Sequence, residues 1–250
     1  MIFDELEKKR REGGTQMLAL IDPDSKNDPI LSQIVSVINK SSYDGILVGG
    51  STISDNNFED RLKTIRDQTD LPVIIFPGDS SQVSKIADGI LFLSLLSGRN
   101  PKYLIEEQVA SSKKIYNYKL EVIPTGYLLL KTNKKTTVEV VSNTDSLEMT
   151  DTENIISHAL ASQYLGNKLL FLECGSNSES TININLLNKI SNYITIPIMV
   201  GGGIKDKSTA IKLANNGASY LVIGSLIEQT LDYKLLLDIN ESIHELNGNK

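Results

Sequence analysis

The sequence contains no tryptophan and a single cysteine, Cys174, among its 250 residues. Without tryptophan, the aromatic platforms on which single-stranded nucleic acid stacks are not expected. One cysteine excludes an internal disulfide and fits a reducing compartment, so we expect a cytoplasmic protein. No run approaches the about 18 apolar residues of a membrane span, and the charged segment 1–14 lacks the apolar core of a signal peptide.

Long runs of positive charge are also missing. The formal net charge is −6, and the basic clusters Lys8–Arg11 and Lys131–Lys135 are short enough to be solvated surface. An acidic chain of this kind is a poor candidate for binding duplex DNA or anionic lipid through charge alone. We therefore expect no nucleic-acid partner.

What the sequence does contain is a series of short apolar runs, each followed by a polar segment long enough for a helix. Continuous apolar character over so few residues is typical of parallel strands that are covered on both faces. The eight runs are Met17–Ile21, Gly45–Val48, Val73–Phe76, Ile90–Leu93, Glu121–Ile123 (with Gly126–Leu130 as a candidate continuation), Leu169–Glu173, Ile198–Val200 and Tyr220–Ile223.

Helical patterns separate these runs. They cover Ile30–Asn39, Pro101–Asn117, Thr152–Tyr164, Ile184–Ile190, Lys207–Asn215 and Leu226–Leu246, and an additional helix, Phe3–Arg11, is placed to cap the barrel bottom. Eight alternations of strand and helix predict one (β/α)₈ TIM-barrel domain over residues 1–250. An open, doubly wound sheet is the structural alternative.

Two connections are irregular. Only twelve residues separate Phe76 from Gly89, which barely accommodates a crossover helix. We expect a degenerate or missing third helix, and therefore a groove along the barrel wall. The second irregular segment is Lys131–Thr150, in which Thr137–Val141 alternates like a candidate small hairpin.

Glycines follow the seventh and eighth strands. Gly201, Gly202 and Gly203 let backbone approach an anion closely, and Gly224-Ser225 opens the last helix, whose amide groups and dipole favour negative charge. Phosphate sites recur at these two loops in this fold. The pair of loops favours a phosphorylated substrate over simple tight turns.

Carboxylates stand at two other strand ends. Asp22 and Asp24 flank a proline after the first strand, and oxygen ligands there suit Mg²⁺, although a turn or helix cap is the plain alternative. Glu173 ends an otherwise apolar strand, where a carboxylate is costly unless it is paired or functional. It is a candidate general base or a ligand for substrate hydroxyls.

We assign no functional role to the remaining reactive side chains. Cys174 is more simply a small buried residue than a nucleophile. His158 and His244 fall on predicted helices, and no lysine stands at a strand end, which argues against a Schiff-base aldolase.

Five segments together resemble the geranylgeranylglyceryl phosphate synthase family, which includes bacterial heptaprenylglyceryl phosphate synthases. They are Leu20–Asp24, Val48–Thr52, Ile74–Gly78, Phe92–Ser97 and Val200–Ile204, and the similarity runs essentially end to end. The resemblance implies a Mg²⁺-dependent prenyltransferase that moves a polyprenyl group, geranylgeranyl by expectation, from its diphosphate to the 3-hydroxyl of sn-glycerol 1-phosphate.

The resemblance also implies site residues. Asp22 and Ser51 match metal ligands of the family, and Glu173 and Tyr127 match catalytic positions. The positions that match substrate-binding residues are Phe171, Leu172, Glu173, Cys174, Gly175, Ser176, Asn177, Gly202, Gly203, Gly224 and Ser225.

Three of these positions depart from the family's motif. Phe171 replaces a tyrosine and loses its hydroxyl, Cys174 replaces an alanine, and Asn177 replaces a glycine. Asparagine tolerates positive φ better than most residues, so these changes bear on affinity for the phosphate more than on the reaction.

The resemblance further implies a homo-oligomer and leaves transient membrane contact open. Two other functions remain: a barrel isomerase or lyase acting on a sugar phosphate, which needs a paired acid and base, and a non-catalytic barrel that binds a phosphorylated metabolite, which needs neither Glu173 nor a metal.

Overall fold

Eight parallel strands close into a barrel in a computed structural model that describes residues 1–51, 53, 55–176 and 178–248. The strands pair in chain order, and β8 pairs with β1. They are β1 (Gln16–Ile21), β2 (Gly45–Val48), β3 (Val73–Ile75), β4 (Gly89–Leu95), β5 (Glu121–Leu129), β6 (Leu169–Glu173), β7 (Ile198–Gly201) and β8 (Tyr220–Ile223). The barrel prediction is confirmed, and the open-sheet alternative is wrong.

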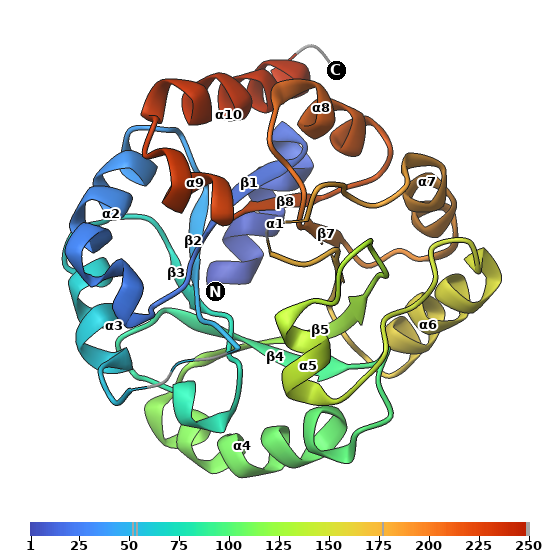
Figure 1. Ribbon diagram of the computed structural model, residues 1–250, viewed down its shortest axis with the longest axis horizontal. Coiled ribbons are helices and arrows are strands. Elements are labelled where there is room, and N and C mark those ends of the chain that lie inside the picture. The colour runs from blue at the N-terminus through green and yellow to red at the C-terminus, as the bar shows by residue number, and fades with distance from the viewer. Residues whose placement is uncertain (52, 54, 177, 249–250) are drawn as a thin grey trace.

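Helices surround the barrel, as Figure 1 shows. The longer ones are α2 (Leu31–Asn39), α3 (Phe58–Arg66), α4 (Glu107–Tyr118), α6 (Thr152–Tyr164), α7 (Ile184–Tyr193), α8 (Lys207–Asn215) and α10 (Tyr233–Gly248). The helix α3 was not among those expected, although Phe58, Leu62 and Ile65 repeat with helical spacing and are buried. Within the described part of the chain, no helix combines the length and apolar character that a membrane span requires.

The apolar runs are explained by burial of each strand on both faces. In β2, Ile46 and Val48 pack against the helical layer, whereas Leu47 points into the barrel and packs with Leu18 and Ile74. Successive side chains of a strand point to opposite faces, so a strand between two apolar layers needs no polar alternation.

The third crossover is degenerate, as the short connection predicted. It contains only η2 (Ser80–Gln82), a single 3₁₀ turn whose N-cap Asp79 accepts a hydrogen bond from the Ser81 amide at 2.8 Å. A further turn of π-helix, η3 (Lys102–Glu106), precedes α4.

Two expectations were wrong. The segment Thr137–Val141 is not a hairpin but part of a helix, α5 (Thr137–Ser142), which begins with a capping box between Thr136 and Glu139. The stretch Leu226–Leu246 is not one helix, because α9 (Ser225–Thr230) ends at Leu231, which has a positive φ of 48°.

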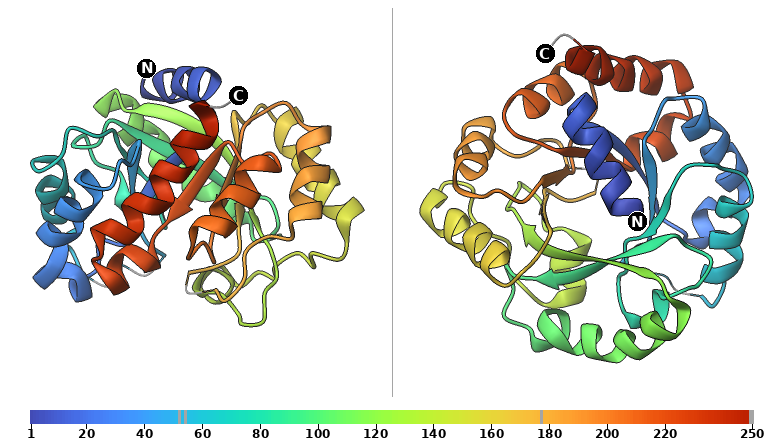
Figure 2. Two further views of the ribbon diagram at one scale, coloured as in Figure 1. Left: turned by 90° about the horizontal axis from the view of Figure 1, so that it is seen from above. Right: turned by 180° about the vertical axis from the view of Figure 1, so that it is seen from behind.

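The N-terminal helix α1 (Ile2–Gly13) closes the amino end of the barrel, as expected (Figure 2). Phe3 and Leu6 join the apolar cluster inside the barrel. Glu7 accepts a hydrogen bond from the buried Tyr220 hydroxyl at 2.6 Å and pairs with Arg10 at 2.8 Å. Burial opposes ionisation of Glu7, but hydrogen bonds from Arg10 and Tyr220 prevail and lower its pKa. The helix is therefore held by both apolar packing and a charged contact.

The contact between Tyr220 and Glu7 supplies a stability test. Tyr220→Phe should lower the free energy of unfolding by about 2 kcal/mol, because it removes a buried hydrogen bond to a charged group. Urea denaturation followed by circular dichroism measures this change. The control is Tyr193→Phe, since that side chain is 55% exposed, and equal losses in both variants would contradict the proposed anchoring of α1.

Candidate functional site

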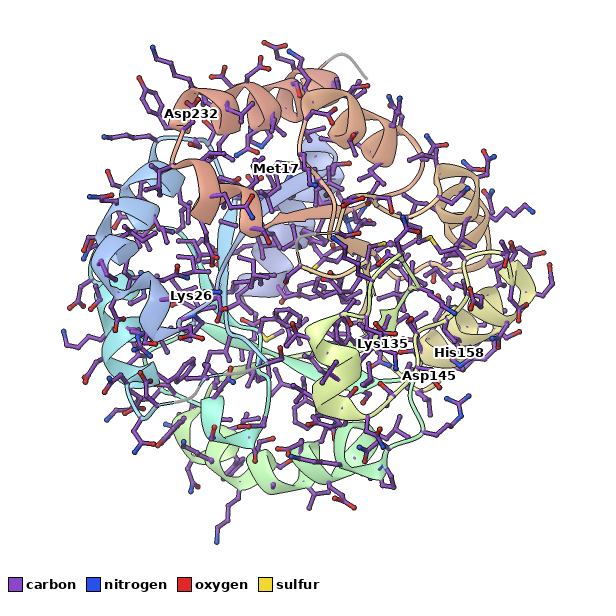
Figure 3. All side chains as sticks on the ribbon, in the orientation of Figure 1. Met17, Lys26, Lys135, Asp145, His158 and Asp232 are labelled. Carbon is purple, nitrogen blue, oxygen red and sulfur yellow. The ribbon has the colours of Figure 1, made fainter. Side chains whose placement is uncertain are left out.

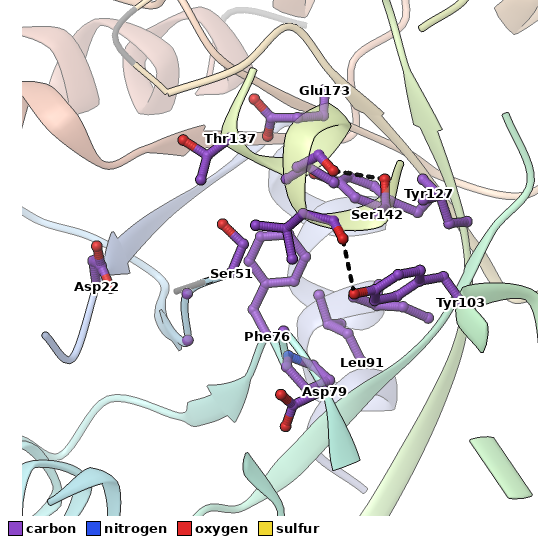
Figure 4. A pocket seen from close by; sticks show the side chains of 18 of the residues that line it. Asp22, Ser51, Phe76, Asp79, Leu91, Tyr103, Tyr127, Thr137, Ser142 and Glu173 are labelled. Atoms are coloured by element: carbon purple, nitrogen blue, oxygen red, sulfur yellow. Dashed lines mark hydrogen bonds between the residues drawn. The ribbon is translucent and has the colours of Figure 1, made fainter. Parts of the chain in front are cut away.

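A cavity of about 280 Å³ opens where the loops after the strands converge. Figure 4 shows Asp22, Ser51, Tyr127 and Glu173 around it. Of the residues expected at the site, those that line the cavity are Asp22, Ser51, Tyr127, Glu173, Gly175, Ser176, Gly224 and Ser225. These residues come from strands and loops as far apart in sequence as the first and the eighth, and barrel closure brings them together.

The cavity continues from the barrel mouth toward α4. Its lining includes Leu91, which belongs to the cluster inside the barrel, and Ile90, which belongs to the outer one. It also includes Val83, which lies in the short third connection, and Gln108 of α4. The groove expected beside a degenerate third helix is therefore present, and its walls are largely apolar near β3 and β4.

Helix α5 lies over part of this cavity. Thr137, Val138 and Val141 line it, and the Tyr103 hydroxyl donates a hydrogen bond to the Val141 carbonyl at 3.4 Å (Figure 4). The polar segment after β5 thus contributes a wall of the site, which its hairpin-like alternation did not indicate.

Glu173 is buried at the end of β6 and is 7% exposed. The Gly175 amide donates a hydrogen bond to Oε1 at 2.5 Å. A Cβ at Gly201 would lie 2.7 Å from Oε2, and one at Gly202 would lie 2.9 Å from Oε1. Gly202 also has φ of +87°, which side-chain-bearing residues rarely adopt. Two of the glycines after β7 therefore make room for this carboxylate.

Burial raises the pKa of the Glu173 carboxyl from 4.5 to about 7, although the Gly175 hydrogen bond lowers it. A carboxyl group with this pKa can exchange a proton near neutral pH. Burial likewise raises the pKa of Tyr127 well above its ordinary value, with the nearby Glu173 adding to the effect. Tyr127 therefore stays protonated, and its hydroxyl remains a hydrogen-bond donor.

Three aromatic rings pack together at the inner end of the cavity, where Phe76 and Tyr127 line it and Phe171 lies behind them. Tyr127 meets Phe76 edge-on at 5.7 Å between ring centroids, and Phe171 lies 5.3 Å from Tyr127 and 5.2 Å from Phe76. Phe171 is fully buried below Gly201. The tyrosine hydroxyl that Phe171 lacks is thus missing from the layer behind the cavity, near Glu173.

Asp22 faces the loop after β2. Its Oδ1 atom is buried and has no hydrogen-bond partner, and a Cβ at Gly50 would lie 2.3 Å from that atom. Its Oδ2 atom pairs with Lys26 at 2.8 Å. Asp24, by contrast, caps η1 (Ser25–Ile30) and accepts the Lys26 amide at 3.4 Å, so it has the plain capping role.

A second, small cavity of about 60 Å³ lies between the loops after β7 and β8. Gly203, Gly224 and Ser225 line it together with Lys205 and Gln229. Gly203, with φ of +74°, packs against Ser180 of the loop after β6. The glycine loops predicted to hold an anion therefore do form one concave surface.

Some predicted positions lie elsewhere. The side chains of Leu172 and Cys174 are fully buried in the outer apolar cluster, so either residue could contact a ligand only through its backbone. Burial raises the pKa of the Cys174 thiol, which disfavours the reactive thiolate. Asn177 lies outside the described residues. His158 lies on α6 (Figure 3) and His244 on α10.

Three residues at the site were not anticipated. Lys26 (labelled in Figure 3) lies 3.8 Å from Glu228 of α9, which accepts a hydrogen bond from the Asp22 amide at 3.4 Å. Gln82 donates to the Gly50 carbonyl at 2.8 Å and accepts from the Gly78 amide at 3.1 Å. Lys26 stands four residues after Asp22, but Asp22 precedes η1, so this spacing did not indicate a shared helical turn.

Comparisons with known proteins agree with this geometry. The model of the PcrB family matches residues 7–242. The geranylgeranylglyceryl phosphate synthase of Flavobacterium johnsoniae is 40% identical over 227 residues, covering 91% of this chain and 93% of that protein. The same enzyme of Chitinophaga pinensis is 32% identical over 243 residues, covering 97% and 96%.

A solved structure extends the likeness to three dimensions. The (S)-3-O-geranylgeranylglyceryl phosphate synthase from Thermoplasma acidophilum, in complex with sn-glycerol-1-phosphate, superposes with a TM-score of 0.91 at 35% identity. The superposition covers 98% of this chain and 99% of that one.

The burial of Glu173 generates a pH-dependent prediction of stability. Between pH 4.5 and about 7 the unfolded chain releases the Glu173 proton while the folded chain keeps it, so stability falls as pH rises through this window. Glu173→Gln lacks this loss. Relative to the wild type, the free energy of unfolding of the variant should therefore rise by about 3 kcal/mol between low pH and pH values above 7.

Thermal unfolding at pH 5 and pH 8 measures this difference. We expect a clear gain for the variant at pH 8 and a smaller one at pH 5. Parallel curves for the two proteins would mean that Glu173 titrates alike in the folded and unfolded chains.

Proposed function

The chain belongs to the PcrB family, in which its relatives are geranylgeranylglyceryl phosphate synthases, and we propose that it transfers a polyprenyl group to sn-glycerol 1-phosphate. The prenyl donor is a diphosphate, geranylgeranyl diphosphate by the names of the relatives. The product is an ether at the 3-hydroxyl of the glycerol phosphate.

One observation carries this proposal. A single cavity joins a buried carboxylate, Glu173, to the glycine loop at Gly224-Ser225 and to an apolar groove beside β4. An acceptor with a phosphate and a hydroxyl, and a donor with a long apolar chain, need such a combination of surfaces. A sugar-phosphate isomerase needs no apolar groove, and a passive binding barrel needs no buried carboxylate.

The glycerol phosphate end fits the smaller cavity. Backbone amides at Gly203 and Gly224, with the start of α9, favour an anion, and Lys205 adds positive charge. Gly175 and Ser176 line the larger cavity with Glu173, and the Gly175 amide donates a hydrogen bond to that carboxylate. A phosphate held there would direct the glycerol hydroxyls toward the carboxylate.

Glu173 then serves as the general base. The C1–oxygen bond of the prenyl diphosphate breaks and diphosphate leaves, while the 3-hydroxyl oxygen forms a bond to C1 and gives its proton to Glu173. Positive charge builds at C1 during this step. The ionised carboxylate and the ring faces of Phe76 and Tyr127 stabilise such charge, and the Tyr127 hydroxyl is a donor for an oxygen of the acceptor.

The residues near Asp22 fit a magnesium ion. The buried Oδ1 atom of Asp22 has no hydrogen-bond partner in the protein, and Ser51 lines the same cavity. Mg²⁺ commonly binds one or two carboxylates, and water and substrate phosphates complete its coordination shell. When bound, Mg²⁺ would neutralise charge on the diphosphate.

Product formation tests the proposal directly. Labelled sn-glycerol 1-phosphate and geranylgeranyl diphosphate should give a lipid-extractable product with Mg²⁺, and little product after chelation by EDTA. Failure to transfer label to any prenyl diphosphate, at several chain lengths, would exclude the transferase.

Glu173 gives a second test. Glu173→Gln should lower turnover by at least about 10²-fold, because it removes the general base. In the wild type, turnover should fall as pH drops below about 7, where Glu173 becomes protonated. Unchanged turnover in the variant would remove Glu173 from the mechanism.

Asp22 gives a third. Asp22→Asn should raise the Mg²⁺ concentration at half-maximal turnover by about 10-fold or more, since a neutral amide replaces a charged ligand. An unaltered Mg²⁺ titration would contradict its role as a ligand.

A further inference from the structure

Arg61 is a charged residue on the buried face of α3. Phe58, Leu62 and Ile65 form the rest of that face, and Arg61 itself is only 4% exposed. A guanidinium in such a position is costly unless its N–H groups are bonded. The partners that satisfy it therefore indicate what the residue is for.

All five N–H groups of Arg61 have an acceptor. Nε and Nη2 donate to the two carboxylate oxygens of Asp28, at 2.5 and 2.9 Å. Nη1 and Nη2 donate to the two oxygens of Asp55, at 2.6 Å each. Nη1 also donates to the Pro23 carbonyl at 3.0 Å. Five donors in a fixed plane are the full capacity of the side chain.

These acceptors belong to the two loops that carry the proposed cation ligands. Pro23 directly follows Asp22, and Asp28 lies in η1 of the same loop. Asp55 lies four residues after Ser51, in the connection between β2 and α3. One side chain thus joins the loop after β1 to the loop after β2, while Arg61 itself does not line the cavity.

We infer that Arg61 is a positioning residue, which holds the loops of Asp22 and Ser51 in the relative placement that a divalent cation and the diphosphate require. This inference rests on the proposed function. It extends that function to a residue that acts only through others.

Two features favour positioning over simple stabilisation. The side chains of Asp28 and Asp55 are 48% and 30% exposed, so water could solvate them without Arg61. Replacement of a whole buried ion pair by apolar residues is often neutral or stabilising, so such a pair is weak evidence for a stabilising role. The hydrogen bonds from Arg61 also lower the pKa of both carboxyls, which keeps the planar, two-pronged contacts charged and directional.

Arg61→Lys tests this inference because lysine keeps the charge but cannot form the planar fork. Binding of Mn²⁺, followed by electron paramagnetic resonance of the free ion, should weaken by about 10- to 100-fold, the usual effect of losing a partner behind a metal ligand. Amide hydrogen exchange in residues 24–28 should become faster. The KM for sn-glycerol 1-phosphate should stay unchanged, because that substrate is anchored at the loops after β7 and β8.

Arg66→Lys is the matched control. Arg66 lies on the same helix and donates to the Thr69 carbonyl at 2.9 Å, away from the cavity, so its replacement should leave Mn²⁺ binding unaltered. Asp55→Asn is a milder second variant for use if Arg61→Lys does not fold, and it should weaken Mn²⁺ binding in the same direction.

The outcomes distinguish failure of the positioning role of Arg61 from failure of the proposed cation site. If the wild type, Arg61→Lys and Asp55→Asn bind Mn²⁺ equally well, the positioning role is overturned and the proposed cation site stands. If the wild type binds no Mn²⁺, the proposed cation site is overturned and the positioning role with it.

Discussion

Pairing of β8 with β1 closes the sheet, and the position of every candidate functional group depends on that closure. Because all strands are parallel, their carboxyl ends form one rim. Asp22 after β1, Glu173 at the end of β6 and Gly224 after β8 share a cavity for this reason. The amino end of the barrel is used differently: α1 covers it with Phe3 and Leu6 and a charged contact to Tyr220. One end is thus sealed for stability, and the other is left open for ligands.

At the open end, the buried carboxylate of Glu173 restricts the neighbouring positions at the end of β7 to glycine. Glu173 lies so close to Gly201 and Gly202 that a Cβ at either position would collide with it. The same burial that raises its pKa to about 7 disfavours its ionised form. Gly201 and Gly202 therefore make room for this carboxylate, and Gly203 lines the small cavity proposed to hold the phosphate.

On the opposite side of the mouth, polar side chains from the outer layer hold the loops. Gln82 joins the loops after β2 and β3 through Gly50 and Gly78, and Arg61 joins the loops after β1 and β2. The short third connection is part of this arrangement, because its single 3₁₀ turn carries Gln82 and leaves the wall beside β4 open as a groove. The short connection thus supplies Gln82, which joins two loops, and leaves open the groove that is proposed to bind the prenyl chain.

The sequence by itself determined the eight strands, the closing helix α1, the short third connection and the candidate roles of Asp22, Glu173 and the glycine loops. Each depends on local pattern: a run of apolar residues, a connection length, or a polar residue at a strand end. Only the tertiary structure decided that Thr137–Ser142 is a helix over the cavity and that the last helical stretch breaks at Leu231. It alone revealed Lys26 and Glu228 in the cavity, and Gln82 and Arg61 behind the loops that line it. Each also has a partner on another loop, up to 206 residues away for Asp22 and Glu228, and a periodic pattern carries no information about contacts over such separations.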